Sequence, residues 1–319
     1  MKKLKLFFLL LILCKYGYSQ NYLAYYSSID NAQVYMADSN YFEASKIYKT
    51  AFKKYDAFSD DYVDAYTCAV YLKKYNLAKK YIYTAVENGY NPSYIFDTTS
   101  IYDGLQPKCN KITFNKNKLN RIRMNYLNNI NLAYSIEIIK LFGLDQGIRN
   151  SNLEHAEDSL IQKILSSDSI FKNKYIDLHF RNSEIIDSVN SKVFYELISE
   201  NGFSRREILP EAYMGGIVIL AHTFCQYKNY DYDSFIKQLK DLVIKGDIAP
   251  LSFARIFDKY YMEVYDCEYY GTLPSDKINL YDPINVDKRR SEIGLTPTYI
   301  REKITKRKLI LKNFNNTSN

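Results

Sequence analysis

Along most of the chain, apolar residues recur every three or four positions, which is the spacing of one face of an α-helix. Extended structure is expected only locally, at residues 268–273 and 278–281. The pattern therefore predicts an all-α fold with at most one small β-hairpin.

Two blocks near the N-terminus repeat similar side chains at the same spacing. The first contains Tyr41, Ala44, Tyr48 and Ala51, and the second, 34 residues later, contains Tyr75, Ala78, Ile82 and Ala85. The alanines allow two antiparallel helices to approach closely, while the larger side chains fill the space between neighbouring hairpins. A period of about 34 residues is typical of paired helices. Residues 25–92 therefore resemble the tetratricopeptide repeat family, without its consensus tryptophan and glycine.

The resemblance implies that residues 20–92 form an arm of two helical hairpins that can bind a protein or peptide partner. About three repeats are needed to bury the core of such an array. We therefore expect the arm to pack against downstream residues or against a partner. Residues 93–129 are polar and poorly periodic, so we predict a connecting segment there, with one short helix near residues 94–102.

We predict a helical C-terminal domain over residues 130–305, where the helical period returns. Its helices are expected at about residues 131–149, 153–165, 174–199, 211–224, 233–245 and 250–264. One face of the first helix is marked by Leu132, Ile136, Ile139 and Phe142. A similar stripe in the third helix consists of Ile176, Phe180, Ile185, Val189, Val193, Tyr195 and Ile198. The helix at 211–224 contains the most apolar run, and we expect it to be the central core helix.

Five short polar motifs follow one another in this domain. They are Asp145-Gln146-x2-Arg149, His222 after the apolar helix, Asp258-Lys259, Tyr270-Gly271-Thr272 and Val286-Asp287-x-Arg289-Arg290-x3-Gly294-Leu295. In this order they are similar to a bacterial protein family known only as a domain of unknown function, the 6624 family, over residues 130–303. The chain departs from that family's pattern at Ser204, Lys259, Glu268 and Leu273. The resemblance identifies the domain and implies no reaction.

The motifs supply two sets of candidate functional residues. Candidate catalytic residues are His222, Asp145 and Asp258, and candidate binding residues are Arg149, Tyr270, Arg289 and Arg290. An aspartate beside His222 would orient the imidazole as a general base. Arg289 and Arg290 offer a fork for a carboxylate or phosphate, or for an aspartate across the domain. In the alternative interpretation, which we favour, the same residues form a buried polar network with a structural role.

Other catalytic and metal-binding patterns are weak. The chain contains neither G-x-S-x-G nor H-E-x-x-H, the motifs of two large hydrolase classes. A zinc site could combine His222 and Cys225, three residues apart on a helix, with Cys267. That spacing matches no standard zinc motif, so we predict neither a metal nor a cofactor.

Four cysteines follow the predicted leader, at Cys68, Cys109, Cys225 and Cys267. In an oxidising compartment they allow three disulfide pairings, of which Cys225 with Cys267 is the first to test. The alternative is that most of them are small buried apolar side chains.

Residues 1–19 are predicted to be a signal peptide, because lysines precede an apolar run that is too short to span a bilayer. The small residues Gly17 and Ser19 favour cleavage between Ser19 and Gln20. Lipid attachment at Cys14 is the alternative. We therefore expect export to the periplasm or the exterior, with no integral membrane segment after cleavage.

The formal net charge of +7 falls to +3 without the four lysines of the leader, which leaves 39 of the 43 basic residues against 36 acidic ones. Such a small excess does not favour a nucleic-acid partner. The basic residues gather near the end of the chain, and we expect a solvated tail at residues 306–319. Together these features favour an exported protein- or peptide-binding scaffold over an enzyme. The alternative is a hydrolase-like enzyme with a His/Asp/Arg cleft around His222.

Overall fold

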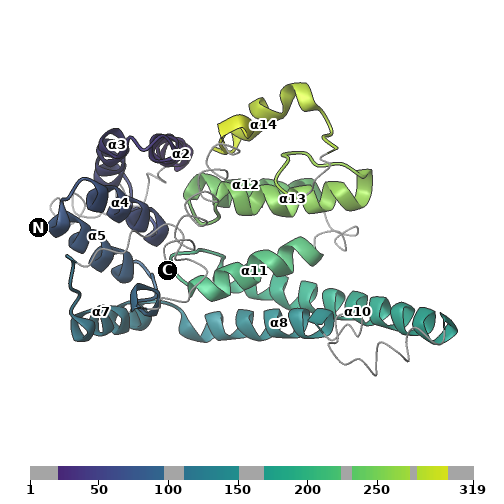
Figure 1. Cartoon of the computed structure of the whole chain (residues 1–319). Helices are drawn as coiled ribbons and strands as arrows, with labels where there is room; N and C mark the ends of the chain where they lie inside the picture. The colour runs from purple at the N-terminus through teal and green to yellow at the C-terminus, as the bar shows by residue number, and fades with distance from the viewer. Residues whose placement is uncertain (1–20, 97–110, 151–168, 224–231, 274–278, 301–319) are drawn as a thin grey trace, which may run out of the picture.

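A computed structural model gives the fold (Figure 1). It describes residues 21–96, 111–150, 169–223, 232–273 and 279–300. Among these residues, the one β-type contact is an isolated bridge between Glu268 and Leu280. The predicted all-α fold is therefore confirmed.

Several predicted features lie outside the described residues. They are the leader with its cleavage site at Ser19 and Gln20, Cys14, Cys109, Cys225, the helix at 153–165 and the tail at 306–319. The side chain of Arg149 also lies outside them.

The helices fall into an N-terminal and a C-terminal group. The first group contains α2 (Leu23–Ala37), α3 (Tyr41–Lys54), α4 (Ser59–Tyr71), α5 (Tyr75–Glu87), α6 (Ser93–Phe96) and α7 (Lys116–Asn129). The second contains α8 (Leu132–Asn150), α10 (Ser169–Asn201), α11 (Pro210–Thr223), α12 (Tyr232–Lys245), α13 (Pro250–Tyr265), the 3-10 helix η4 (Pro283–Asn285) and α14 (Val286–Glu292). In the described part of the chain, no helix is both long enough and apolar enough to cross a lipid bilayer.

Helices α2 to α5 form two helical hairpins, in which α2 packs on α3 and α4 packs on α5. The repeated side chains Ala44, Tyr48, Ala51, Ala78, Ile82 and Ala85 are all buried. Ser39 and Lys73, 34 residues apart in the sequence, both adopt left-handed backbone, with φ of 61° and 57°. Such values are uncommon for residues other than glycine, so the two hairpins repeat one turn geometry. The predicted hairpins are confirmed.

Helix α7 lies within the segment predicted to be only a connection. It packs against α5 through the fully buried Leu119. Arg123 donates a 2.6 Å hydrogen bond to the carbonyl of Gly89, at the end of α5, and Tyr126 donates one of 3.1 Å to the carbonyl of Ile208. This helix therefore covers the second hairpin and ties it to the C-terminal domain. The sequence prediction missed it because its residues are mostly polar.

The arm packs directly against the C-terminal domain along α2. The backbone N–H of Tyr22 donates to the carbonyl of Ile244 at 2.8 Å, and the hydroxyl of Tyr26 donates to that of Ile248 at 3.2 Å. Arg206 lies against the rings of Tyr22 and Phe58, 4.6 and 4.4 Å from their centres. The arm therefore buries its incomplete core on downstream residues, one of the two arrangements expected from only two repeats.

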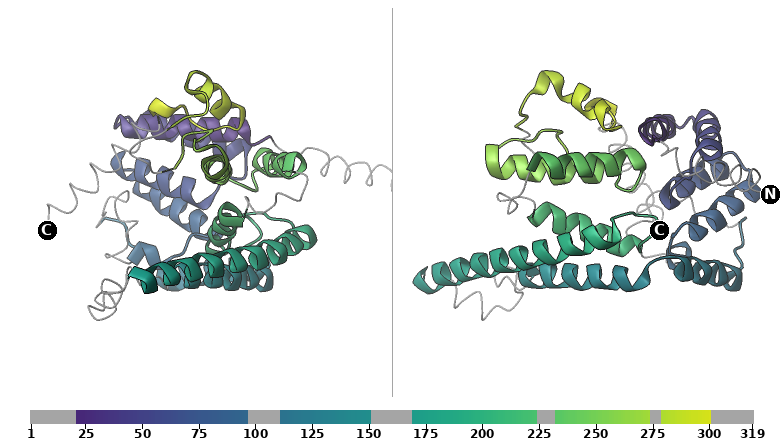
Figure 2. Two further views of the ribbon diagram at one scale, coloured as in Figure 1. Left: turned by 90° about the vertical axis from the view of Figure 1, so that its right-hand side faces the viewer. Right: turned by 180° about the vertical axis from the view of Figure 1, so that it is seen from behind.

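Helix α11 lies at the centre of the C-terminal domain, with α8 and α10 on one side and α12, α13 and α14 on the other (Figure 2). Gly215 and Gly216 allow its neighbours to approach closely. A Cβ atom on Gly215 would lie 2.9 Å from Cβ of Phe142, and one on Gly216 would lie 2.7 Å from the ring of Phe203. The prediction that this apolar helix is the central core helix is confirmed.

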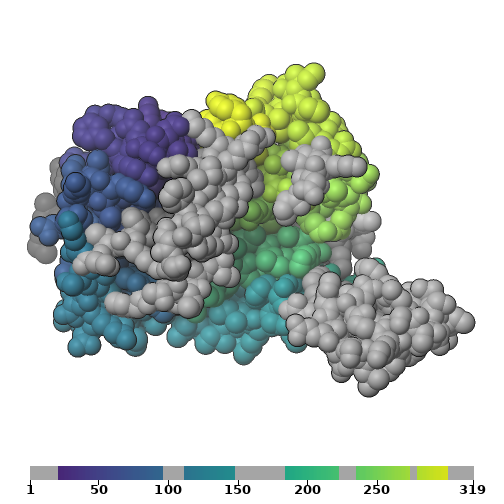
Figure 3. Space-filling model, in the orientation of Figure 1, coloured from purple at the N-terminus to yellow at the C-terminus, as the bar shows by residue number. Residues whose placement is uncertain are grey.

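The apolar stripes predicted for α8 and α10 are only partly buried. Phe142 on α8 and Val193 and Ile198 on α10 pack against the core, but other members of the stripes do not. Leu132, Ile136 and Ile139 are between 36% and 43% exposed on the outer side of α8, and Ile185 and Val189 are more than half exposed on α10. Helix α8 runs along the lower surface of the molecule in Figure 3. The inner faces are partly polar instead, and their buried polar residues are Ser135, Asp145, Asp187, Asn190 and Ser191.

Two further carboxyl groups lie at the junction of the arm and the domain. Burial raises the pKa of Asp61 to about 7, against the opposing effects of a hydrogen bond from Tyr25 and the charge of Arg205. Burial also raises the pKa of Asp30 to about 6, although a hydrogen bond from Thr296 lowers it. Both carboxyl groups line a cavity of about 160 Å³ between the two parts.

These groups predict that the protein loses stability as the pH rises. An unfolded aspartate has a pKa of about 3.9, so between about pH 4 and pH 7 the folded protein binds more protons than the unfolded chain. The free energy of unfolding should therefore fall over this range, and the fall should be smaller in Asp61→Asn. Urea denaturation at several pH values measures this difference. Asp241→Asn, which changes an exposed aspartate on α12, should behave like the natural protein, and equal slopes in all three proteins would contradict the assignment.

Candidate functional site

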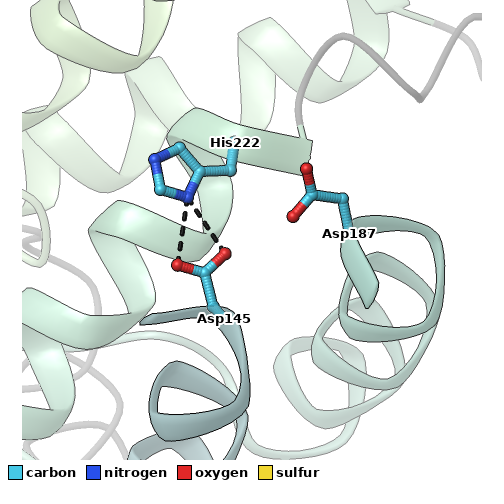
Figure 4. Close-up of side chains that lie close together, drawn as sticks. All are labelled: Asp145, Asp187 and His222. Carbon is cyan, nitrogen blue, oxygen red and sulfur yellow. Dashed lines mark hydrogen bonds and ion pairs between the residues drawn. The ribbon is translucent and has the colours of Figure 1, made fainter. Parts of the chain in front are cut away.

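Three polar side chains meet where α8, α10 and α11 contact one another (Figure 4). His222, in the last turn of α11, places Nδ1 3.0 and 3.1 Å from the two carboxylate oxygens of Asp145 on α8. Asp187 on α10 completes the group, and one nitrogen or oxygen of each residue lies within 4.8 Å of the others. We call these three residues the polar centre.

Helical periodicity places each residue of the polar centre. On α8, Asp145 lies one turn after the buried Leu141, and on α10, Asp187 lies one turn before the buried Asn190. Asn190 donates a 3.2 Å hydrogen bond from Nδ2 to the carbonyl of Leu141. The two helices are therefore held together one turn away from the two carboxylates.

The polar centre has the geometry of a histidine oriented by a carboxylate. A carboxylate only accepts hydrogen bonds, so Nδ1 of His222 carries the proton that it shares with Asp145. Gln146 donates a second hydrogen bond, from Nε2 to Asp145 at 2.7 Å. Asp145 has no exposed side-chain surface, whereas 23% of the His222 side chain is exposed. Because Nδ1 is bound to Asp145, Nε2 is the nitrogen of His222 that can act as a general base.

The polar centre also offers the donor set of a cation site. Two carboxylates and an imidazole are ligands that many divalent metal ions accept. Cys267 does not belong to this group and is a buried free thiol. Among the described residues, Cys267 does not join His222 in the predicted zinc site. Cys225, which belongs to that site and to the predicted disulfide, lies outside the described residues.

Sequence reasoning missed Asp187. It belongs to none of the five motifs. Two residues of the apolar stripe predicted for α10, Ile185 and Val189, lie on the opposite face of the helix. A signal was present, because Asp187, Asn190 and Ser191 follow one another at helical spacing and so share a face. A polar face that opposes an apolar one is usually assigned to solvent, although this one is buried.

Asp258, another candidate catalytic residue, holds a loop. Its carboxylate accepts hydrogen bonds from the backbone N–H groups of Tyr269, Tyr270 and Thr272, at 2.8, 2.6 and 2.7 Å. The hydroxyl of Thr272 donates a fourth, at 2.6 Å. Burial nevertheless raises the pKa of Asp258, which these hydrogen bonds oppose.

The candidate binding residues Arg289 and Arg290 hold the same loop from the other side. Arg289 donates from Nε and Nη2 to the carbonyl of Tyr269, at 3.1 and 2.9 Å. Arg290 donates from Nη1 to the carbonyl of Tyr270 at 2.6 Å and from Nε to that of Thr296 at 2.5 Å. Both arginines are buried in α14.

The candidate residues therefore divide into two groups. Asp145 and His222 lie together in the polar centre, whereas Asp258 and the two arginines bind the donors and acceptors of residues 269–272. Tyr270, the last candidate, belongs to that loop and is buried. The loop and its charged partners form a structural network of the kind that the sequence favoured.

Replacement of Asp258 tests this network. The amide of Asp258→Asn would turn an N–H group toward some of the four donors, and each buried donor left without an acceptor costs roughly 1–3 kcal/mol. The free energy of unfolding, measured by urea denaturation, should fall by at least that amount. Asp241→Asn changes an exposed aspartate on α12 and should alter it by no more than about 0.5 kcal/mol. Equal stability of the two variants would be inconsistent with the network.

Comparison with known proteins gives no further assignment for this arrangement. No protein-family model matches the chain, and searches of curated proteins and of solved structures return no match either.

Proposed function

We propose that the protein is an exported scaffold that binds an acidic segment of a partner protein through its N-terminal arm, residues 20–92. The 34-residue period and the paired hairpins support tetratricopeptide-like repeats in this arm. Stacked helical repeats offer extended surfaces for such partners. Export rests on the predicted leader.

The observation that carries the proposal is a groove of about 400 Å³ between α2 and α3. Its lining includes Lys46, Lys54, Ile47, Tyr55, Ser28 and Thr50. The opposite side of α2 carries the buried Tyr25, Tyr26 and Ile29, so the groove lies on the side of the helix that does not face the arm's core. Lys54 and Lys46, which also pairs with Glu43 at 2.9 Å, place positive charge beside an apolar floor. This combination favours an extended partner segment with carboxylate side chains.

Charge reversal in the groove tests the proposal. The double variant Lys46→Glu, Lys54→Glu should bind an acidic partner roughly tenfold more weakly or worse. Capture of proteins from an envelope extract, followed by affinity measurement on the captured protein, provides the readout. Lys192→Glu, Lys240→Glu is the matched control, because both lysines are exposed on helices of the C-terminal domain. Failure to capture any protein, or equal capture by both double variants, would refute the scaffold.

A second candidate function is hydrolysis at the polar centre. The specific observation in its favour is that the imidazole of His222 lies within hydrogen-bond distance of the buried Asp145 and is partly exposed. In this arrangement, Nε2 of His222 would remove a proton from water while Asp145 stabilises the resulting imidazolium. A nucleophilic serine or cysteine is not required.

Chromogenic ester and phosphate substrates test the second candidate. If the natural protein turns over one of them, His222→Gln and Asp145→Asn should each lower kcat by about 10²–10⁴-fold, since general-base catalysis contributes that much. Circular dichroism establishes whether each variant is folded, and Asp241→Asn should retain full activity. Turnover that persists unchanged in folded His222→Gln would exclude His222 as the base.

A further inference from the structure

The two carboxylates of the polar centre lie inside a three-helix contact, close to a histidine. Asp145 is fully buried and Asp187 is 8% exposed. We propose that Asp145, Asp187 and His222 form a binding site for one divalent metal ion of the zinc or manganese type. The inference does not depend on the scaffold proposal, because its residues lie on α8, α10 and α11 and not in the N-terminal arm.

The separations within the polar centre suit ligands of a single ion. Two ligand atoms that each lie about 2.1 Å from a metal ion are roughly 3.0–3.4 Å apart in octahedral or tetrahedral coordination. Nδ1 of His222 lies 3.0 and 3.1 Å from the oxygens of Asp145. The third ligand comes from Asp187, whose oxygen lies within 4.8 Å of both. A small movement of that side chain would complete a three-ligand set.

The donor atoms indicate the class of ion. Carboxylate oxygens favour magnesium, calcium and manganese, whereas imidazole nitrogen favours zinc and later transition metals. A set of two carboxylates and one imidazole therefore suits zinc or manganese better than calcium or a soft ion such as copper(I). Because three helices supply one ligand each, the site depends on the packing of the whole bundle.

Two neighbouring amides support the assignment independently of the ligands. Gln146 donates a 2.7 Å hydrogen bond to Asp145, and ligating carboxylates in metal sites are commonly oriented by such an outer hydrogen bond. Asn190 is fully buried one turn from Asp187, and its Oδ1 has no hydrogen-bond partner among the described residues. Asn190 therefore keeps an unused acceptor one helical turn from the proposed ligand Asp187.

A bound ion would change the role of the histidine. With Nδ1 of His222 as a ligand, the hydrogen bond to Asp145 is replaced and the imidazole no longer acts as a general base. Metal binding and the second candidate function therefore use the same residues in different ways. Direct measurement of binding, without any activity assay, separates the two.

The test uses the untagged mature chain after treatment with a chelator and dialysis. Titration calorimetry with zinc and with manganese should show about one equivalent bound, and the preferred ion should raise the Tm by roughly 5 °C at saturation. Asp187→Asn, Asp145→Asn and His222→Gln should each weaken binding by more than about tenfold. The control Asp241→Asn should bind like the natural protein.

Two results would overturn the proposal. The first is failure of the natural protein to bind either ion, which decides the question even if the variants do not fold. The second is undiminished binding by folded Asp187→Asn and His222→Gln, because the ion would then occupy another part of the chain, such as its cysteines.

Discussion

Buried carboxylates impose the constraint that organises this structure. A carboxylate removed from water loses several kcal/mol unless donors or a positive charge replace its hydration. Asp258 receives four donors from the loop at 269–272, Asp61 receives the hydroxyl of Tyr25, and Asp145 receives the imidazole of His222. The contacts of Asp61 and Asp145 join helices that are 36 and 77 residues apart, and those of Asp258 join α13 to the loop that follows it. Three packing arrangements therefore each depend on hydrogen bonds to a different aspartate. They are α13 against its loop through Asp258, α2 against α4 through Asp61, and α8 against α11 through Asp145.

The spacing of residues along the sequence was sufficient to predict those helices and turns that depend on residues close together in the sequence. The paired hairpins follow from alanines and aromatic residues 34 positions apart, and the ends of α10 and α12 follow from Gly202 and Gly246, both with left-handed backbone. Helix α7 could not be predicted in this way. Its polar residues give little periodicity, and it is stabilised by one buried leucine and by contacts with α5 that exist only in the folded chain.

Burial, in contrast to helix formation, was predicted poorly. Sequence periodicity shows which residues share a face, and the larger apolar face is ordinarily the one that is buried. In α8 and α10 the inner faces also carry Asp145, Asp187 and Asn190. His222 and Gln146 hydrogen-bond to Asp145, and Asn190 donates to the carbonyl of Leu141. The pairing of Asp258 with Arg289 through one loop was equally inaccessible. Its contacts run through backbone N–H and carbonyl groups, which have the same chemistry at every position.

The protein therefore presents two surfaces of different character. The arm has a groove lined by Lys46 and Lys54, where we propose that a partner binds, and the polar centre has an imidazole held by a buried carboxylate. The hydrogen bond in the polar centre requires a proton at Nδ1 of His222 that is shared with Asp145. Nitrogen-15 NMR of the metal-free mature protein, with the His222 signal assigned by His222→Gln, reports this directly. We expect the neutral imidazole to be protonated at Nδ1, whereas protonation at Nε2 would contradict this arrangement.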